Sequence, residues 1–319
     1  MSTQSDIIER LGPASRVAVI RLRSLGDCVL TTPTLHLLKQ ARPDLEIAVV
    51  AEERFAAVFE NHPDVSRVLP PQARAIRAFS PELCLNLHGG TRSARLTLLS
   101  RARYRAGFDI FRPGWIYNTP IPTAQQTLGI SRRVHTAEHL ASAVFYLGAP
   151  ISEVPRAQLR PRAGRAKGAP DRPYAVIHAT AAMPEKTWPA DRFLKLAQYV
   201  QRSLDLEPVF IGGPGDDLSM FREWRSVGGA PLGEIMQLMR DASFFAGNDS
   251  GPAHVAAAFG VPQVVVFGPS DAEIWAPWRT PAEILKADGP MHTITVERAI
   301  QAIARLPVAH QKKDPVRAS

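Results

Sequence analysis

The chain has 319 residues, of which 45% are hydrophobic and 21% are charged. This length allows two domains of ordinary size, and the composition excludes a disordered chain. No apolar run reaches the ~18 residues of a membrane span, and residues 1–10 are polar and carry no signal-peptide core, so we expect a cytoplasmic protein. The two cysteines, Cys28 and Cys84, form no disulfide framework and no cysteine-based metal site.

The formal net charge is +8 at pH 7. A positive charge favours acidic partners such as nucleic acid, anionic lipid or phosphorylated sugars. No DNA- or RNA-binding motif accompanies it, so we expect no nucleic-acid partner. The charge is compatible with a peripheral contact with the acidic inner face of the inner membrane.

Short apolar runs alternate with helical stretches in the first half of the chain. Strands are predicted at residues 16–22, 45–51, 65–69 and 83–87, and helices at residues 28–40, 52–61 and 91–100. This alternation predicts an α/β fold with a parallel, doubly wound sheet. The sequence from 150 to 173 is rich in proline and arginine, which indicates a linker at 156–172 between a domain at 1–155 and a second one.

The same alternation of strands and helices is predicted in a second domain at 173–306, which is followed by a tail at 307–319. Strands are predicted at residues 174–178, 208–211, 244–246 and 263–267, and helices at residues 190–201, 216–224, 234–240, 252–259 and 298–305. Gly260 and Pro262 are expected to end the helix that Pro252 begins. The sequence therefore predicts two domains of similar architecture.

The turn at residues 247–251 joins a buried strand to a helix in the second domain. It lies at the carboxyl end of a strand, where open α/β sheets bind ligands. The backbone N–H groups of Ser250, Gly251, Ala253 and His254 are expected to lack intrahelical partners and to attract an anion, whereas Pro252 has no N–H. A capped turn without a ligand is the alternative interpretation of this feature alone.

The sequence around this turn is a more specific feature than the turn itself. Residues 248–262 read Asn-Asp-Ser-Gly-Pro-x-His-x-Ala-Ala-x-x-Gly-x-Pro, and Phe-Gly-Pro-Ser and Trp-x-Pro follow. The first half carries Arg-x-x-Ser-Leu-Gly-Asp at 21–27 and Leu-His-Gly-Gly-Thr-Arg-Ser at 87–93, and the second carries Lys-Thr-Trp-Pro at 186–189. The chain strongly resembles family 9 glycosyltransferases, the ADP-heptose:lipopolysaccharide heptosyltransferases and their relatives. The resemblance implies the GT-B fold, two Rossmann-like domains that face each other across a cleft.

Asp27 ends the Ser-Leu-Gly-Asp turn after the first predicted strand. An acidic residue at this place often caps the following helix. The resemblance implies a second role, general base for the acceptor hydroxyl, because a desolvated carboxylate is a stronger base than one in water. The two roles are compatible.

Lys186 precedes the Trp-Pro pair in the second domain. A lone lysine in a loop is usually a solvated charge, but the matching family position binds the nucleotide phosphates, where a cation stabilises the departing diphosphate. No acidic cluster suggests Mg²⁺. We therefore expect an inverting transferase without a metal or other cofactor, in which Lys186 also contributes to catalysis.

The remaining donor-site residues come from the resemblance. Ser250, Gly251 and His254 would complete the phosphate site, although a histidine near a helix start is more often structural. Asp249 is expected to shape the turn through hydrogen bonds to backbone N–H groups. Asp216, or alternatively Asp217, could reach a ribose hydroxyl. Asp216 follows Gly-Gly-Pro-Gly, which lacks the G-x-G-x-x-G spacing of dinucleotide-binding enzymes.

Arg92 and His88 are expected to line the acceptor side of the first domain. An arginine there suits an anionic acceptor such as a sugar carboxylate or a core phosphate. Asn86 stands where relatives commonly have Asp, and His88 where many have Gln, so the resemblance leaves the identity of the acceptor open.

The sequence thus predicts transfer of a heptose, or a related sugar, from ADP-heptose to a lipopolysaccharide core acceptor. Closure of the two domains would bring Asp27 to the donor. Two alternatives remain: a sugar-nucleotide epimerase or hydrolase of the same fold, and a saccharide-binding protein without catalysis. The sequence does not indicate an oligomeric state.

Overall fold

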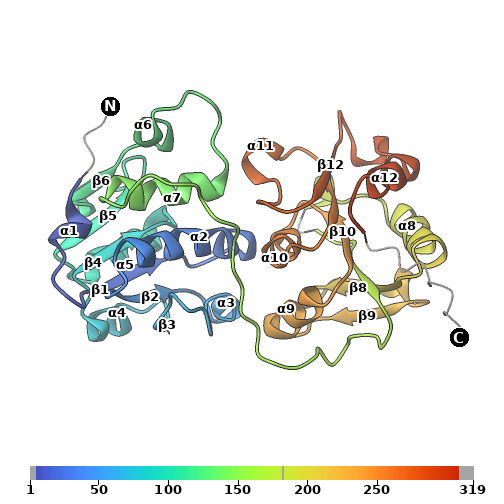
Figure 1. The fold of residues 1–319 in the computed structure, drawn as a ribbon, viewed down its shortest axis with the longest axis horizontal. Helices are drawn as coiled ribbons and strands as arrows, with labels where there is room; N and C mark the ends of the chain where they lie inside the picture. The colour runs from blue at the N-terminus through green and yellow to red at the C-terminus, as the bar shows by residue number, and fades with distance from the viewer. Residues whose placement is uncertain (1–4, 182, 309–319) are drawn as a thin grey trace, which may run out of the picture. The chain divides into compact units, whose positions relative to one another are not determined.

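The computed structural model describes residues 5–181 and 183–308, and it divides into two compact units (Figure 1). Unit 1 runs to Ala163 and also includes Glu273–Arg279, whereas unit 2 covers Gly164–Ala272 and continues from Thr280. The α/β fold class, of GT-B type, is confirmed. The mutual placement of the two domains across a cleft stays a prediction. Of the predicted tail, only residues 307 and 308 lie within the described residues.

Unit 1 is built on a six-stranded sheet in the order β3-β2-β1-β4-β5-β6, and every neighbouring pair is parallel. The strands are β1 (Arg16–Ile20), β2 (Glu46–Val50), β3 (Arg67–Leu69), β4 (Leu83–Asn86), β5 (Tyr104–Phe108) and β6 (Thr119–Ile121). The central strands are buried on both faces, which is why they read as continuous apolar runs in the sequence.

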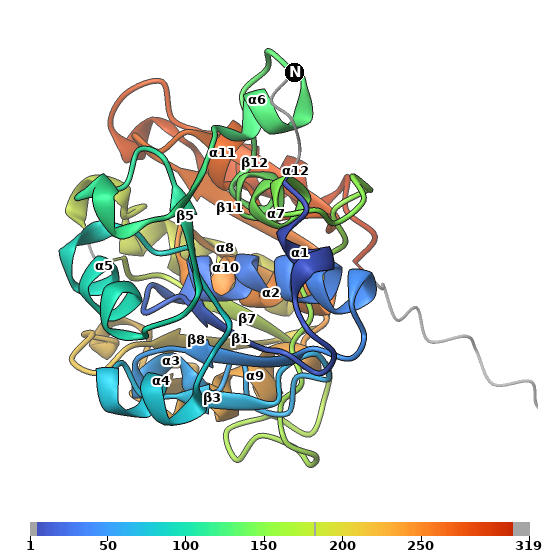
Figure 2. The same ribbon diagram turned by 90° about the vertical axis from the view of Figure 1, so that its left-hand side faces the viewer.

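Helices cover both faces of this sheet. The helices of unit 1 are α1 (Ile7–Arg10), α2 (Leu25–Ala41), α3 (Glu53–Ala56), α4 (Ala73–Phe79), α5 (Gly90–Leu99), α6 (Ala124–Leu128) and α7 (Thr136–Tyr146), with the 3₁₀ turn η1 (Gly114–Ile116). Figure 2 shows α2 and α7, which pack against each other, on one side of the strands, and α4 and α5 on the other. Unit 1 is therefore doubly wound.

Unit 2 repeats this plan in the order β12-β11-β10-β7-β8-β9, again fully parallel. Its strands are β7 (Tyr174–His178), β8 (Glu207–Gly212), β9 (Arg225–Gly228), β10 (Phe244–Asn248), β11 (Gln263–Phe267) and β12 (Ala282–Lys286). In both units the first and fourth strands of the unit lie side by side at the centre of the sheet.

The helices of unit 2 also form two layers. They are α8 (Ala190–Ser203), α9 (Leu232–Arg240), α10 (Gly251–Phe259) and α12 (Val296–Ile303), with α11 (Ala272–Trp275) at the unit boundary and the 3₁₀ turns η2 (Pro184–Lys186), η3 (Ser219–Phe221) and η4 (Met291–Thr293). Figure 1 shows α9 and α10 on one side of the strands, and α8 and α12 on the other. As predicted, Gly260 ends α10 in a left-handed conformation (φ 73°).

Two predicted helices are wrong in extent. The helix expected at 52–61 is only α3, because the chain after Ala56 tightens into bonds of the i to i−3 kind, such as Phe59 N–H to the Ala56 carbonyl. The helix expected at 216–224 is only η3. The carboxylates of Asp216 and Asp217 accept backbone N–H groups of Gly213 and Ser219, and these local bonds compete with helix formation.

Several elements had no counterpart in the sequence prediction: α4, α6, α7, β5, β6, β9 and β12. The short edge strands carry few apolar residues, and β9 is largely exposed. The segment Glu273–Arg279 is a further difference. Sequence reasoning placed it in the second domain, but it packs with unit 1, where the ring of His135 stacks on Trp278 at 4.5 Å and its Nε2 lies 2.8 Å from the Ala276 carbonyl oxygen.

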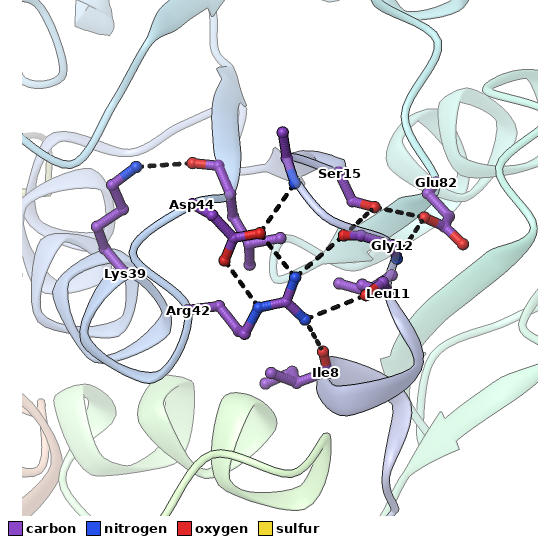
Figure 3. A network of polar contacts seen from close by, with 10 residues as sticks. Ile8, Leu11, Gly12, Ser15, Lys39, Arg42, Asp44 and Glu82 are labelled. Atoms are coloured by element: carbon purple, nitrogen blue, oxygen red, sulfur yellow. Dashed lines mark hydrogen bonds and ion pairs between the residues drawn. The ribbon is translucent and has the colours of Figure 1, made fainter.

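A polar network closes the edge of unit 1 at the amino ends of the strands (Figure 3). The guanidinium of Arg42 donates to the backbone carbonyls of Ile8 (2.7 Å), Leu11 and Gly12, and its Nε and Nη2 donate to the two carboxylate oxygens of Asp44, each at 2.8 Å. This fork-to-fork pairing ties the end of α1 to the loop after α2. The opposite edge, at the carboxyl ends of the strands, carries the candidate site.

No helix among the described residues is long and apolar enough to cross a bilayer. The helices α8 and α12 are amphipathic, as expected for helices that cover a sheet on one side only.

Replacing Phe193 by alanine should lower the free energy of unfolding of unit 2 by about 3–5 kcal/mol. Phe193 is fully buried and meets the ring of Trp188 edge-on at 4.9 Å, so the truncation leaves a cavity. Urea unfolding followed by tryptophan fluorescence measures this loss. Met220→Ala is the control, because Met220 is 55% exposed and should change the free energy by less than about 0.5 kcal/mol. Equal effects of both substitutions would contradict the described core.

Candidate functional site

Each sheet has a point where the chain leaves two adjacent strands in opposite directions. In unit 1 this point lies between β1 and β4, and in unit 2 between β7 and β10. Loops diverge beyond the carboxyl ends of such strand pairs and leave a crevice, which is where open α/β sheets bind ligands. Most of the predicted site residues follow one of these four strands.

Asp27 lies in the first turn of α2, directly after β1. One oxygen of its carboxylate accepts a hydrogen bond from Ser24 Oγ at 3.0 Å, and the other lies 3.5 Å from Arg21 Nη1. The side chain of Asp27 is 24% exposed, so it is held in place but accessible. Its position in the first helical turn agrees with a stabilising interaction with the helix dipole.

Arg21 is the buried partner of this carboxylate, with only 5% of the residue exposed. Burial lowers the pKa of Arg21 from its ordinary value, and the charge of Asp27 opposes that shift. Sequence reasoning quoted Arg21 only as part of a motif and missed this contact. An arginine that directly follows a buried strand, six residues before an acid, is the signal that could have found it.

His88 follows β4, the neighbour of β1, and is partly buried. Burial and the charge of Arg21 lower its pKa, while the nearby charge of Asp27 opposes this. The turn that carries His88 is organised by Asn86, whose Oδ1 accepts the backbone N–H groups of His88 (3.0 Å) and Gly89 (3.2 Å). Asn86 is fully buried, so its role in the described chain is to shape this turn.

Arg92 lies in the first turn of α5, at the same edge of unit 1. Its Nη1 lies 2.7 Å from a carboxylate oxygen of Glu52, which follows β2, and its side chain is 60% exposed. The guanidinium therefore faces solvent with part of its charge already balanced. An anionic ligand would compete with Glu52 for it.

In unit 2, β10 leads into α10 through the predicted turn. Gly247 lies where the two central strands approach most closely, and a Cβ there would come within 2.8 Å of the Phe245 ring and 3.0 Å of the His178 carbonyl oxygen. The predicted row of open amides is partly wrong, because the N–H of Ala253 donates to the Ser250 carbonyl at 3.1 Å. Fewer backbone N–H groups at this helix start are therefore available to an anion than the sequence predicted.

Lys186 and Asp249 meet at this helix start. Lys186 Nζ lies 3.2 Å from Asp249 Oδ2, and the two side chains are 28% and 9% exposed. The sequence predicted that Asp249 would bind backbone N–H groups, whereas its carboxylate pairs with Lys186. The lysine belongs to η2, after β7, so the pair joins the loops of the two central strands.

Asn248, the last residue of β10, fixes the loop that carries Lys186. Its Oδ1 accepts the backbone N–H of Trp188 at 2.8 Å, and its Nδ2 donates to the Thr180 carbonyl at 3.3 Å. Asn248 is fully buried, so these bonds form away from water, where an unpaired amide would be costly. The position of Lys186 is therefore set by a buried side chain of the neighbouring strand.

A second polar chain runs beside this pair. Ser250 Oγ lies 3.0 Å from His178 Nδ1, the Nε2 of the same ring lies 3.2 Å from Thr180 Oγ1, and Thr180 Oγ1 donates to Asp216 Oδ2 at 2.6 Å. Asp216 Oδ2 also accepts the Gly213 N–H at 2.8 Å. Sequence reasoning named Ser250 and Asp216 but missed His178 and Thr180, whose only signal is their place at the end of a buried strand and two residues after it.

His254 is only 5% exposed and lies on α10 among buried alanines and Val255. This burial favours a structural role over direct contact with a ligand. Gly251 is the first residue of α10, one residue before Pro252, where the helix was predicted to begin. Among the described residues, no group of three or more His, Cys, Asp or Glu side chains is placed to hold a metal ion.

Comparison with known families places this geometry in context. The sequence model of glycosyltransferase family 9 (heptosyltransferase) matches residues 72–302. Lipopolysaccharide heptosyltransferase 3 of Escherichia coli K12 is 25% identical over 291 residues, which cover 81% of this chain and 83% of that protein.

Solved structures give the same picture. A family 9 glycosyltransferase from Veillonella parvula superposes with a TM-score of 0.80 at 25% identity, covering 94% of this chain and 98% of that one. An E. coli heptosyltransferase solved with ADP has a TM-score of 0.73 at 20% identity, covering 91% and 99%, and this likeness shows the fold alone.

The stability of unit 2 should fall as the pH falls from about 6.5 to about 4. Burial lowers the pKa of His178 to about 4, although the charge of Asp216 opposes the shift. In this window the unfolded chain binds a proton that the folded chain excludes, so the free energy of unfolding decreases, whereas above pH 6.5 this contribution is constant.

Urea unfolding of the wild type and of His178→Asn at pH 7, 6 and 5 measures this effect. The variant should lose less stability on acidification. His62, whose pKa burial also lowers to about 4, lies in unit 1 and supplies a matched control, His62→Asn. An equal decline in the wild type and His178→Asn would show that His178 does not exclude the proton.

Proposed function

Because the chain belongs to glycosyltransferase family 9 and is a glycosyltransferase, we propose a specific reaction for it. It transfers a heptose from ADP-heptose to the inner core of lipopolysaccharide. The names of its relatives support the sugar and the acceptor class. The observation that carries the proposal is the pairing of Lys186 with Asp249 at the start of α10, which places a cationic group beside the amino end of a helix at a switch point.

Asp27 is the general base in this proposal. Its carboxylate takes the proton of the acceptor hydroxyl while that oxygen attacks the anomeric carbon of the donor. The bond from this carbon to the phosphate oxygen breaks, ADP leaves with the electron pair, and the configuration of the carbon inverts. Ser24 and Arg21 support the role, because they hold the carboxylate in one orientation while leaving it accessible.

Lys186 and the amino end of α10 would receive the diphosphate. In the ligand-free chain Asp249 balances the lysine charge, and we propose that the phosphate oxygens take over Lys186 when the donor binds. A fixed cation and helix amides stabilise the negative charge that develops on the leaving group, which is the role that a metal ion has in other transferases. Asp216 would contact the ribose, and Ser250 and Gly251 the phosphates.

Arg92 and His88 lie at the same edge of unit 1 as Asp27, and we propose that they contact the acceptor. The exposed guanidinium of Arg92 suits a carboxylate or phosphate of the lipopolysaccharide core. Because this acceptor is anchored in a membrane, the proposal includes a peripheral contact with the inner face of the inner membrane, which the net positive charge supports.

Asp27→Asn should lower kcat by about 10²–10⁴-fold and leave the dissociation constant of ADP within about twofold. The amide keeps the shape of the side chain and its bond to Ser24 but cannot accept the proton. Transfer of heptose from ADP-heptose to a core acceptor measures kcat, and calorimetry measures ADP binding. Asp6→Asn, an exposed acid on α1, is the matched control and should leave both unchanged.

Undiminished turnover in Asp27→Asn would refute the base assignment. Free heptose released by the wild type without any acceptor would instead indicate a hydrolase. Glycan binding without any turnover of donor would indicate a saccharide-binding protein.

Lys186→Ala should weaken ADP binding by about 10–100-fold, the range expected for one hydrogen bond to a charged group. The substitution also leaves the carboxylate of Asp249 without its partner beside the phosphates, which adds repulsion. Calorimetry measures the affinity for ADP and for adenosine. The adenosine affinity should stay constant, because adenosine has no phosphate for Lys186 or Asp249 to meet. Lys195→Ala, a lysine 66% exposed on α8, is the control. An unchanged ADP affinity in Lys186→Ala would exclude the phosphate role.

A further inference from the structure

The polar chain from Ser250 to Asp216 joins loops of three neighbouring strands, β10, β7 and β8. We infer that His178 is a positioning residue of the donor site: in a single neutral tautomer, with the proton on Nε2, it links Ser250 at the start of α10 to Thr180 and Asp216. The inference rests on the proposed function, because it assigns to this chain the task of holding the groups that bind the donor.

The direction of the hydrogen bonds follows from Asp216. A carboxylate only accepts, so the Thr180 hydroxyl donates its one proton to Asp216 Oδ2 at 2.6 Å. Thr180 Oγ1 can then only accept from His178 Nε2, 3.2 Å away, which places the ring proton on Nε2. The unprotonated Nδ1 is left to accept from Ser250 Oγ at 3.0 Å. All donors therefore point from Ser250 towards Asp216.

The ring is well placed for this role. His178 ends the fully buried strand β7, is 7% exposed, and lies between β8 and β10. Burial disfavours the imidazolium, so the ring stays neutral and keeps one donor and one acceptor. A neutral ring with two committed nitrogen atoms cannot turn without breaking both bonds.

Two consequences for the donor site follow. In this tautomer the single hydroxyl proton of Ser250 goes to His178 Nδ1 and not to the Asn248 carbonyl, 3.1 Å away, so Ser250 would face a phosphate with its backbone N–H and not with its hydroxyl. The backbone carbonyl of Ser250 also accepts the N–H of Ala253, so both the side chain and the backbone of Ser250 are held by hydrogen bonds.

At the other end of the chain, Asp216 Oδ2 receives both Thr180 and Gly213. Its Oδ1 is then the oxygen that would meet a ribose hydroxyl. The chain thus connects the group that contacts the ribose to the group that contacts the phosphates.

Nuclear magnetic resonance of the protein labelled with ¹⁵N in histidine tests the tautomer. The signals of His178 are identified by their loss in His178→Asn. We expect Nε2 to carry the proton in the wild type, and we expect Thr180→Val, which removes the acceptor for Nε2, to shift the ring away from this single tautomer. A proton on Nδ1 in the wild type would overturn the inference, as would an unchanged tautomer in Thr180→Val.

ADP affinity tests the positioning role. His178→Leu removes both bonds of the ring, and Ser250→Ala removes the hydroxyl that the ring holds. Each should weaken ADP binding about 3–10-fold, as expected for one neutral hydrogen bond, and the double variant should be no weaker than either single variant. His178→Asn, whose amide oxygen replaces Nδ1, should retain near wild-type affinity.

Thr280→Val is the control for loss of a hydroxyl, since Thr280 Oγ1 donates to Val261 beyond the other end of α10. It should leave ADP affinity unchanged. Additive losses in the double variant, or equal losses in His178→Asn and His178→Leu, would overturn the inference in favour of a general packing role. A wild type that does not bind ADP would overturn the proposed donor, and the tautomer measurement would then still decide whether the chain of bonds exists.

Discussion

The two hydrogen bonds of Asn248 are the constraint on which the candidate site of unit 2 depends. This buried side chain at the end of β10 holds the backbone of Trp188 at 2.8 Å and of Thr180 at 3.3 Å, and both belong to the loop after β7. The lysine of that loop is thereby kept 3.2 Å from Asp249, the residue that follows Asn248. Parallel strands place their carboxyl ends at one edge, but only such cross-strand bonds keep two loops in one register.

Unit 1 has a buried asparagine at the equivalent place, but its bonds differ. Asn86 ends β4, the fourth strand of its sheet, as Asn248 ends the fourth strand of unit 2. Asn86 holds the turn of His88 through two backbone N–H groups, and its Nδ2 donates to Ser93 (3.1 Å) and Tyr117 (2.9 Å). Asn248 thus joins the loops of two neighbouring strands, whereas Asn86 fixes the turn after its own strand. The polar edge of each sheet is thus stabilised from within its core.

The cations of both crevices are balanced before any ligand binds. Arg21 lies beside Asp27, Arg92 beside Glu52, and Lys186 beside Asp249. The Arg92 side chain is 60% exposed, so its pair with Glu52 contributes little to stability, and an anionic ligand can replace the carboxylate at a small cost and meet a cation that is already oriented. Arg21 differs, because its burial makes Asp27 a partner that it cannot lose cheaply. A fixed pairing suits the role of general base that we propose for Asp27.

The amino-acid sequence alone determined the two α/β domains, the turn before α10 and its end at Gly260, because alternation of apolar runs and the conformational preferences of glycine and proline act over a few residues. Its motifs also identified Asp27 and Lys186. Only the tertiary structure decided which groups meet: Arg21 with Asp27, Lys186 with Asp249, and the chain from Ser250 through His178 to Asp216. The partners in unit 2 come from strands far apart in the sequence, and the order of strands in the sheet, together with the loops that follow them, brings them together. Arg21 and Asp27 lie only six residues apart, and they meet because the chain turns from β1 into α2. For the same reason no local pattern placed Glu273–Arg279 with unit 1, since that assignment depends on contacts with His135 and its neighbours rather than on the residues of the segment itself.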